Sequence, residues 1–401
     1  MSKAGISEEA RPWSEVVNVS TTYCYMSLKI ASRAFRIATR HYSTRSNPLR
    51  VLGIETSCDD TSAAVVTSDR RILSEVRHGQ RDMHEPMGGI VPTLASLGHS
   101  RNLPNVICQA LDEAGLSVHE LDGVAVTRGP GLPPCLPVGL NAGKTLAAVC
   151  KKPLIGVHHM EAHALTARLT ESNAPAFPFM TLLISGGHTI LLTANSLGDY
   201  EILVDTMDNA VGEAIDKTAR LLSLPWEGSS PGPALERAAA QGDPIRFLQR
   251  LPTPLLNDKK SMFAFSFSGL KTAVARLVEK ENVSTTQDIN DVAAAFQARC
   301  IGHIEQKLKL ALDREIKCNK KPLSSLIVSG GVASNRYFRD RLQSVTAAYG
   351  LPLVCPPPKL CTDNGAMIAW AGIERLQAGL VDDYTITALP KWSLESLKDA
   401  L

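Results

Sequence analysis

The chain has 401 residues, 44% of them hydrophobic, with 42 Lys and Arg against 40 Asp and Glu. A chain of this length and composition can bury a large core, and we expect two lobes or domains. Its nine cysteines include no Cys-x-x-Cys pair and follow no regular spacing, which argues against a zinc ribbon or a secreted disulfide framework. No apolar run approaches the roughly 18 residues of a membrane span, so we expect no insertion into a bilayer.

The first 48 residues differ from the rest of the chain. From Met26 onward this segment is rich in Arg, Ser and Thr and contains no acidic residue. Arg33, Arg36 and Arg40 recur at helical spacing with apolar residues between them, which is typical of a mitochondrial transit peptide; the alternative is a disordered basic tail. We therefore expect residues 1–48 to direct the protein to the mitochondrial matrix, with Met26 as an alternative start.

The body of the chain is nearly neutral, because residues 49–401 hold 35 Lys and Arg against 37 Asp and Glu. Such a body does not bind nucleic acid through bulk charge, and any RNA contact must use a local patch. The candidate patches are lysine clusters, namely Lys259 with Lys260, Lys271, and Lys317 with Lys320 and Lys321. A solvated helix face or loop is the more common reason for each cluster taken alone.

The first predicted element is a β-hairpin at residues 51–66. Apolar stretches at 51–55 and 62–66 flank a small polar turn at 56–61. Backbone N–H groups and hydroxyls in such a turn can lie against a phosphate group. One hairpin of this kind is weak evidence for a phosphate site.

Residues 156–163 place two imidazoles, His159 and His163, four residues apart where a helix is expected to begin. Residues i and i+4 share one helix face, so both rings can point at one metal ion. Glu161 lies between them and points elsewhere, and the zinc-protease signatures, which place a glutamate directly beside a histidine, fail here. A structural or merely polar role stays open, because a complete site needs a third ligand from a distant part of the chain.

Residues 180–193 repeat the plan of the first hairpin, with the turn Ser-Gly-Gly-His-Thr at 185–189. Farther on, residues 326–335 form an apolar strand, a glycine pair and the start of a helix near Asn335, an arrangement that suits a nucleotide. Segments of helical periodicity lie between these anchors, near residues 91–114, 138–150, 209–222, 291–316 and 362–379. The repeated hairpin and the alternation of strands with helices predict an α/β fold with two related halves.

The last motif is Cys-Thr-Asp-Asn-Gly-Ala-Met at residues 361–367. Thr362 or Asp363 can cap the helix that follows. The functional alternative is that Asp363 supplies the missing oxygen ligand of the metal. Two imidazoles and one carboxylate would leave open positions for a substrate, as a catalytic metal requires.

Taken together, the ordered motifs of the chain resemble the universal tRNA threonylcarbamoyladenosine transferase family, over a stretch from about Arg50 to Ile373. The motifs are Gly-Ile-Glu-Thr-Ser-Cys-Asp, Gly-Gly-Ile-Val-Pro, Gly-Pro-Gly-Leu, His-His-Met-Glu-Ala-His, Ser-Gly-Gly-His-Thr, Gly-Glu-Ala-Ile-Asp-Lys, Phe-Ser-Phe-Ser-Gly-Leu-Lys, Ser-Gly-Gly-Val-Ala-Ser-Asn-Arg and Cys-Thr-Asp-Asn-Gly-Ala-Met. The resemblance implies a two-lobed, duplicated α/β fold like that of actin, sugar kinases and heat-shock ATPases, with a nucleotide cleft between the lobes. We expect an N-terminal lobe at residues 49–178, a C-terminal lobe at 179–371 and a segment at 372–401 that returns to the N-terminal lobe.

The resemblance also implies roles for individual residues. It assigns one divalent metal ion, zinc or iron, to His159, His163 and Asp363. It assigns substrate binding to a set from the second half of the chain: Ser185, Gly186, Gly187, His188, Thr189, Asp216, Gly232 and Asn335. An aromatic amine is a poor nucleophile, so a base would help the reaction, and we expect Asp59 in that role, with Asp60 or Glu55 as alternates.

The family reaction moves a threonylcarbamoyl group from threonylcarbamoyl-adenylate to the exocyclic amine of the adenosine beside the anticodon (position 37) of tRNAs that read A-starting codons, and AMP leaves. The resemblance therefore implies tRNA as a partner, a separate synthase that makes the adenylate, and a homodimer. Asp60, where many bacterial relatives have Glu, fits the mitochondrial branch. Two other classes stay open: a small-molecule kinase of the same fold and a non-enzymatic ATP-driven binding protein, neither of which needs the His159 and His163 pair.

Overall fold

The computed structural model describes residues 47–225, 230–256, 258–259, 261–318 and 321–400. The expected transit peptide lies outside this part of the chain except for its last two residues, Asn47 and Pro48, and so do Lys260 and Lys320. None of the helices in the described part is long and apolar enough to cross a membrane.

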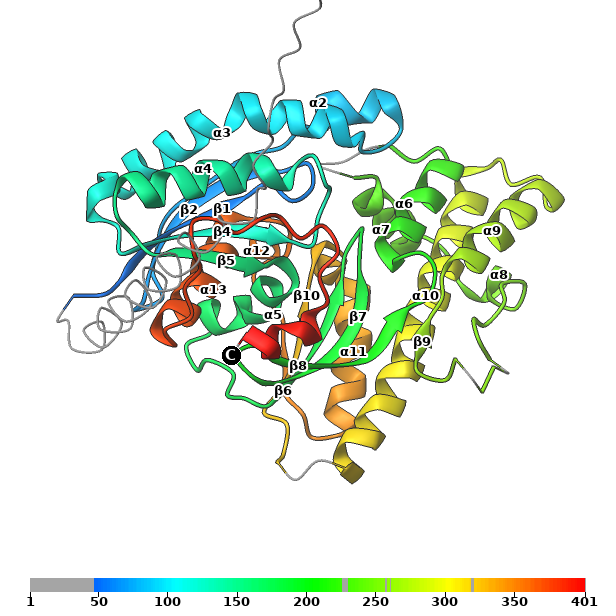
Figure 1. The fold of residues 1–401 in the computed structure, drawn as a ribbon. Helices are drawn as coiled ribbons and strands as arrows, with labels where there is room; N and C mark the ends of the chain where they lie inside the picture. The colour runs from blue at the N-terminus through cyan, green and yellow to red at the C-terminus, as the bar shows by residue number, and fades with distance from the viewer. Residues whose placement is uncertain (1–46, 226–229, 257, 260, 319–320, 401) are drawn as a thin grey trace, which may run out of the picture. The chain divides into compact units, whose positions relative to one another are not determined.

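A five-stranded sheet forms the centre of the first lobe (Figure 1). Its strands are β1 (Arg50–Glu55), β2 (Thr61–Thr67), β3 (Ile72–His78), β4 (Gly123–Gly129) and β5 (Leu154–His158). They lie in the order β3-β2-β1-β4-β5, with β2 antiparallel to β1 and to β3, β4 parallel to β1, and β5 parallel to β4. All of β2 is buried, as expected for a strand whose sheet is covered by helices on both faces.

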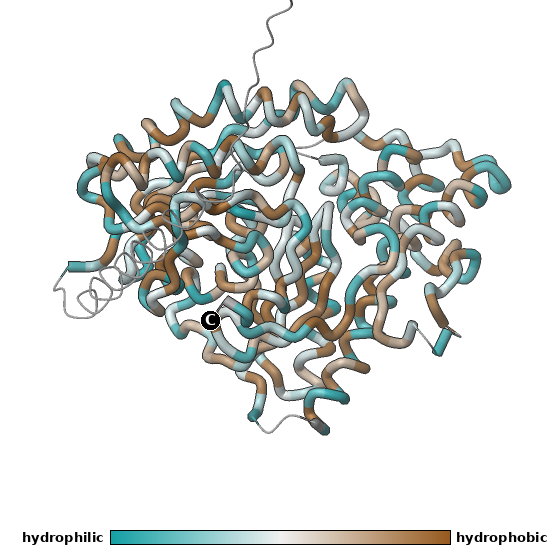
Figure 2. The backbone as a smooth tube through the Cα atoms, viewed as in Figure 1, coloured by the Kyte–Doolittle hydropathy of each residue, from teal (hydrophilic) through white to brown (hydrophobic). Residues whose placement is uncertain are grey.

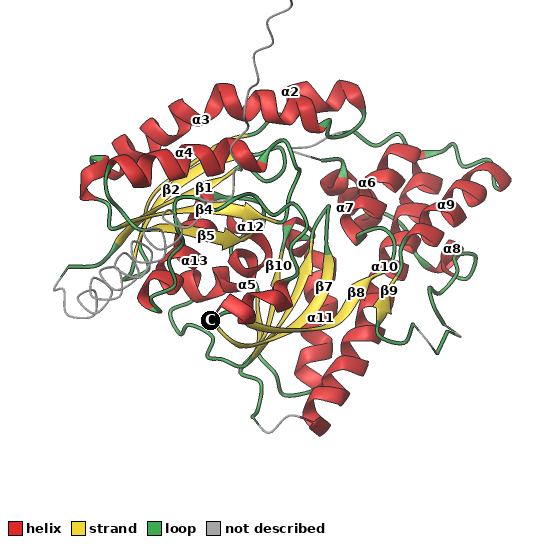
Figure 3. Ribbon diagram, viewed as in Figure 1, coloured by secondary structure: helices red, strands yellow, loops and turns green. Residues whose placement is uncertain are grey.

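A six-stranded sheet forms the centre of the second lobe (Figure 3). Its strands are β6 (Phe179–Ile184), β7 (Thr189–Ser196), β8 (Asp199–Thr206), β9 (Ala264–Phe265), β10 (Leu326–Ser329) and β11 (Leu353–Val354). In the order β11-β10-β6-β7-β8-β9, β6 pairs antiparallel with β7 and parallel with β10. This is the wiring of the first sheet, with β6 in the place of β1, and it confirms the duplicated two-lobed α/β fold.

Four helices cover the first sheet. The helices α3 (Pro92–Ala114) and α4 (Leu136–Val149) lie on one face, and α5 (His159–Thr170) and α13 (Gly365–Gln377) lie on the other (Figure 1). The helix α13 rests directly on the β1–β2 hairpin, because a Cβ added at Gly53 would lie 2.3 Å from the backbone N of Ala369 and one added at Gly365 would lie 2.6 Å from backbone atoms of β2. The expected lobe boundary at residue 371 falls inside this helix.

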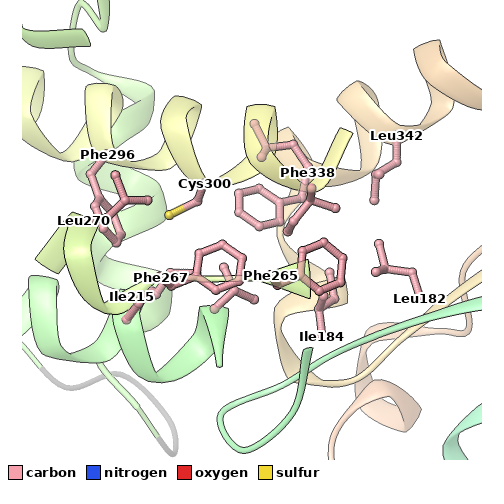
Figure 4. Close-up of a cluster of buried hydrophobic side chains, with 14 of the residues drawn as sticks. Leu182, Ile184, Ile215, Phe265, Phe267, Leu270, Phe296, Cys300, Phe338 and Leu342 are labelled. Atoms are coloured by element: carbon pink, nitrogen blue, oxygen red, sulfur yellow. The ribbon is translucent and has the colours of Figure 1, made fainter. Parts of the chain in front are cut away.

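The other helices belong to the second lobe, apart from the short α2 (Arg81–His84). They are α6 (Val211–Leu221), α7 (Gly232–Ala240), α8 (Ile245–Leu248), α9 (Ser268–Lys280), α10 (Thr286–Cys318), α11 (Arg336–Ala348) and α12 (Pro358–Cys361). Hydrophobic residues gather along the strands and the inner helix faces (Figure 2). One core of this lobe contains Phe296 of α10, Phe338 of α11, Phe265 and Phe267, and in Figure 4 Phe338 faces Phe265 and Phe267 while Phe296 lies beside Leu270. This core fixes the second sheet against its helices.

The helices expected from periodicity correspond to α3, α4, α6, α10 and α13, with bounds that differ by a few residues. One expectation is wrong in its detail. Asn364, and neither Thr362 nor Asp363, caps α13, since its Oδ1 accepts a hydrogen bond of 2.8 Å from the N–H of Met367. Asp363 therefore lies outside the helix, and its carboxylate is available for other contacts.

The chain after α13 contacts both lobes. Asp382 accepts a hydrogen bond of 2.8 Å from the N–H of Gly156, on β5 of the first lobe. Glu395 then accepts one of 3.0 Å from the N–H of Ile202, on β8 of the second lobe. The C-terminal segment thus connects the strand that leads into α5 with the second sheet.

Candidate active site

The start of α5 is held firmly where β5 ends. His158, the last residue of β5, is the N-cap of α5, and its Nδ1 accepts a hydrogen bond of 3.2 Å from the N–H of Met160. Its Nε2 donates a hydrogen bond of 3.1 Å to the carbonyl of Trp392 in the C-terminal segment. With the first turn of the helix fixed in this way, His159 and His163 project from adjacent turns on one face, as their spacing predicts.

The structure brings Asp363 to these two rings across 200 residues of sequence. Its Oδ1 lies 3.4 Å from His159 Nε2 and 3.2 Å from His163 Nε2. One ligand atom from each of the three residues lies within 4.8 Å of the others. Since bonds from zinc to nitrogen or oxygen are about 2.0–2.1 Å, neighbouring ligands in a tetrahedral or octahedral site are separated by about 3.0–3.4 Å. The donor set suits a divalent metal ion, and the two contacts of Asp363 Oδ1 match the spacing of neighbouring ligands around one.

Glu55, at the end of β1, orients His159. Its Oε2 lies 3.0 Å from His159 Nδ1 and accepts a hydrogen bond of 2.6 Å from the hydroxyl of Thr127. The carboxylate is fully buried and also accepts from the N–H of Ser57. A histidine that donates Nδ1–H to a carboxylate presents the lone pair of Nε2, which is the arrangement that supports a metal ligand. Glu55 therefore contacts His159 and has no exposed oxygen with which to take up a proton from a substrate.

The electrostatics of the site favour a cation. Burial alone would lower the pKa of His159, but the carboxylates of Asp363 and Glu55 outweigh it and raise that pKa to about 10. The pKa of His163 is lowered, chiefly by burial, which favours the neutral imidazole that a metal binds. A proton held by His159 balances the surplus of negative charge around the rings, and a bound divalent cation would take its place.

Asp59 and Asp60 lie in the turn after β1. Burial raises the pKa of Asp59, and the negative charge of Asp363 raises it further. Burial raises the pKa of Asp60 to about 7, although Arg77, whose guanidinium is 3.7 Å away, opposes the shift. Both candidate bases, Asp59 and Asp60, therefore lie close enough to Asp363 for its negative charge to raise their pKa values. The pKa of Asp60 is close to neutrality.

The turn 185–189 of the second hairpin lies near the same rings. Burial lowers the pKa of His188 to about 4, and the positive charge of His159 close by lowers it further. The Oγ of Ser185 accepts hydrogen bonds of 3.3 and 3.0 Å from the N–H groups of Gly187 and His188, which closes the turn. A Cβ added at Gly186 or at Gly187 would have no other atom within 4 Å, so the turn is open on its outer side.

Two residues expected to bind substrate are engaged within the protein. The hydroxyl of Thr189 is buried and accepts a hydrogen bond of 2.8 Å from the N–H of Val211, at the start of α6. Asn335 is the N-cap of α11. Its Oδ1 accepts a hydrogen bond of 3.0 Å from the N–H of Phe338, and its Nδ2 donates one of 2.9 Å to Oε1 of Gln297. These contacts place both side chains in positions that hold the local backbone.

Asp216 and Gly232 lie together beside these turns. The N–H of Gly232 donates a hydrogen bond of 3.2 Å to Ser230 Oγ, and a Cβ added at Gly232 would lie 3.5 Å from Asp216 Oδ1, on α6. Burial raises the pKa of Asp216 to about 6, although Arg220, Ser230 and Gly232 oppose the shift. The glycine turn after β10 adjoins the second hairpin, because a Cβ at Gly330, which has φ of 97°, would lie 2.4 Å from the carbonyl of Ile184. The structure thus brings the glycine turn and the start of α6, which carries Asp216, next to the second hairpin, since a Cβ at Gly212 would lie 2.5 Å from the carbonyl oxygen of Ser185.

Sequence reasoning missed the role of Glu161. The side chain does point away from His159 and His163, as expected, but it is fully buried in an ion pair with Arg375 of α13 at 3.2 Å. It also accepts a hydrogen bond of 3.0 Å from the hydroxyl of Tyr200 on β8. The residues around Glu161 in the sequence do not indicate that it pairs with Arg375 and Tyr200, since both partners come from distant parts of the chain.

Comparisons with known proteins agree on one family. A family model described as tRNA N6-adenosine threonylcarbamoyltransferase matches residues 71–370. A curated protein of that name from Brucella ovis is 46% identical over 352 residues, covering 86% of this chain and 96% of the relative. One from Brucella abortus (strain 2308) is 45% identical with the same coverage. Among solved structures, HypF from T. kodakarensis matches 84% of this chain and 49% of its own, with a TM-score of 0.52 and 14% identity, a likeness that concerns the fold alone.

Proposed function

From the premise that this chain belongs to the tRNA N6-adenosine threonylcarbamoyltransferase family and is a transferase that modifies tRNA, we propose the reaction in full. The threonylcarbamoyl group of threonylcarbamoyl-adenylate moves to the exocyclic amine of the adenosine beside the anticodon, and AMP leaves. The observation that carries the proposal is the convergence of His159, His163 and Asp363 beside the turn 185–189. A small-molecule kinase or an ATP-driven binding protein would need the glycine turns but would have no use for this triad.

The triad is proposed to hold one divalent metal ion, zinc or iron. When bound, the metal would act as a Lewis acid toward oxygen atoms of the donor and stabilise negative charge on its carbonyl and phosphate groups. Glu55 contributes by fixing the ring of His159, and the buried imidazole of His163 stays neutral for binding. Asp363 reaches the two rings from the connection between α12 and α13.

The adenylate is proposed to lie between the lobes, against the open turn 185–189. Backbone N–H groups in such a turn suit a phosphate, and the exposed outer side of Gly186 and Gly187 allows close approach. The half-buried carboxylate of Asp216 is a suitable acceptor for a hydroxyl of the ribose, with Gly232 beside it. Asn335 is proposed to act by holding the glycine turn after β10, since its amide already has two partners within the protein.

The proton that the adenosine amine loses is proposed to go to the pair Asp59 and Asp60. The acceptor base stands in a single-stranded loop of the tRNA, where turning it toward a pocket costs little. A base is most useful when its pKa lies near the working pH, and the pKa of Asp60 is raised to about 7. Asp59 shares the same turn and also has a raised pKa.

The setting of the reaction is proposed from the sequence. The basic, acid-free stretch that begins at Met26 supports import into the mitochondrial matrix, where the substrates would be mitochondrial tRNAs that read A-starting codons. A separate synthase would supply the adenylate, and the enzyme would act as a homodimer. The resemblance of the Asp-Asp-Thr turn at 59–61 to the mitochondrial branch supports the same assignment.

The reaction is tested with purified protein, threonylcarbamoyl-adenylate and an unmodified tRNA. AMP and modified adenosine should form in equal amounts, measured by chromatography and by the mass of the digested tRNA. A tRNA with guanosine in place of the acceptor adenosine is the control and should gain no mass. Formation of ADP from ATP with a small acceptor, without mass gain on the tRNA, would refute the proposal in favour of a kinase.

A further inference from the structure

Two side chains of β3 hold the backbone on both sides of Asp363. Glu75 and Arg77 are two residues apart on this strand, so they project from the same face of the sheet. Arg77 donates a hydrogen bond of 2.6 Å to the hydroxyl of Thr362, the residue directly before Asp363. Glu75 contacts the start of α13, directly after Asn364. Asp363 therefore lies between two points anchored to the same strand.

Glu75 accepts hydrogen bonds from the first two N–H groups of α13. Its Oε1 lies 3.1 Å from the N of Gly365, and its Oε2 lies 2.7 Å from the N of Ala366. Asn364, the N-cap, serves the third N–H, that of Met367. The first N–H groups of a helix have no partner within the helix, and a carboxylate is their strongest acceptor because the helix dipole also favours negative charge there.

Ser62 of β2 completes this arrangement. Its Oγ lies 2.8 Å from Glu75 Oε1, 2.9 Å from the carbonyl of Val76 and 2.9 Å from the N of Gly365. The close contact of Gly365 with the backbone of β2 leaves the start of the helix no room to shift toward the sheet. The first turn of α13 is thus fixed to β2 by packing and to β3 by the carboxylate of Glu75.

We propose that Glu75 is a positioning residue for the metal ligand Asp363. This inference rests on the metal site proposed above. A single residue, Asn364, separates Asp363 from the N–H groups that Glu75 holds, so a shift of the helix start moves the Asp363 carboxylate by a similar amount. The contacts of Asp363 Oδ1 at 3.4 and 3.2 Å with the two imidazoles leave little tolerance for such a shift. Glu75 thereby tunes the affinity of the site for its metal without touching it.

The test is Glu75→Gln in the full chain. The glutamine side chain has only one carbonyl oxygen, so it can accept from only one of the two backbone N–H groups. Its NH₂ group would face the other N–H, and because both are donors no hydrogen bond can form there. Loss of a residue that orients a metal ligand typically weakens metal affinity by about 10- to 100-fold. We expect a loss in that range for Zn²⁺, measured by competition with a chelator, and a changed visible absorption spectrum of the Co²⁺-loaded protein.

The matched control is Glu374→Gln, which removes another carboxylate from α13. Glu374 is buried and accepts a hydrogen bond of 2.8 Å from Arg168, and it lies 11 residues, about three turns of helix, after Asp363. Its variant should keep the Zn²⁺ affinity within about twofold of wild type. An equal loss in both variants would show that any loosening of α13 weakens the site, and would overturn the specific role of Glu75.

Wild-type Zn²⁺ affinity in folded Glu75→Gln would also overturn the proposal. If that variant does not fold, Ser62→Ala decides, because it removes the hydroxyl that contacts both Glu75 and Gly365 while leaving the carboxylate in place. A folded Ser62→Ala protein with weakened Zn²⁺ affinity supports the role, and one with unchanged affinity refutes it. The measurement needs neither tRNA nor adenylate, so it is independent of the transfer reaction. A wild-type protein that binds no divalent metal would instead refute the metal site itself, and this inference with it.

Discussion

The buried ion pair between Glu161 and Arg375 predicts a loss of stability that is separate from metal binding. Glu161 is 0% exposed and Arg375 is 6% exposed, and their closest atoms are 3.2 Å apart. In Glu161→Ala the guanidinium keeps its charge but loses its partner, which typically costs about 3–5 kcal/mol for a buried pair. The hydroxyl of Tyr200 loses its acceptor as well. We expect the free energy of unfolding to fall by about 3–5 kcal/mol.

The metal content of the folded variant should remain that of wild type. Glu161 is two residues from each histidine ligand and lies on the opposite side of α5, toward α13 and β8. The assay is unfolding in urea followed by circular dichroism, with metal measured on the native protein by elemental analysis. This combination separates a contribution to packing from a contribution to the metal site.

A double-mutant cycle tests the cause of the loss. Arg375→Met removes the charge while keeping a side chain of similar length, so Glu161→Ala combined with Arg375→Met should recover much of the stability lost in Glu161→Ala alone. The reasoning is refuted if Glu161→Ala costs less than about 1 kcal/mol, which is the range of an exposed pair. It is also refuted if the double variant is no more stable than the single one.

Three further predictions concern the site and the chain's processing. Alanine at His159, His163 or Asp363 should each reduce bound metal well below one ion per chain by elemental analysis and abolish transfer while the fold is kept; full metal in all three variants would contradict the site. Because Asp216 accepts hydrogen bonds best as a carboxylate and its pKa is about 6, the apparent KM for the adenylate should fall as pH rises through about 6; Asp216→Asn should remove this dependence, and a flat KM in the wild type would contradict it. N-terminal sequencing of protein from mitochondria should show a start near residues 42–48, whereas an intact Met1 would contradict import with cleavage.

Local patterns were sufficient to predict the two hairpins and the main helices. The stretches 51–66 and 180–193 fold as β1–β2 and β6–β7, because short apolar runs around a small polar turn have few alternatives. The spacing of His159 and His163 also indicated two of the three residues of the candidate metal site, since i and i+4 positions share a helix face whatever surrounds them. These features depend on periods of two to four residues, which a sequence displays directly.

The remaining parts of the site depend on contacts between distant segments. Thr362, Asp363 and Asn364 are all good helix caps, so their sequence alone does not show which one caps α13. The choice follows from β3, where Glu75 and Arg77 hold the backbone on either side of Asp363. On its own, a Glu between a serine and a valine in a short strand resembles an ordinary solvated residue, and nothing near Glu75 in sequence indicates that it contacts a helix start 290 residues away.

The duplicated scaffold explains why one fold can serve two different tasks at one site. The turns that follow β1 and β6 occupy equivalent places in the two sheets, but they differ in charge. The first turn carries Asp59 and Asp60, whose raised pKa values reflect burial and other carboxylates nearby. The second turn carries Gly186 and Gly187, whose open outer side would let the phosphate of an adenylate approach the backbone closely. In the reaction proposed above, the acidic turn would take up a proton and the glycine turn would hold the leaving AMP. The two halves of the duplicated fold would therefore serve different chemical partners.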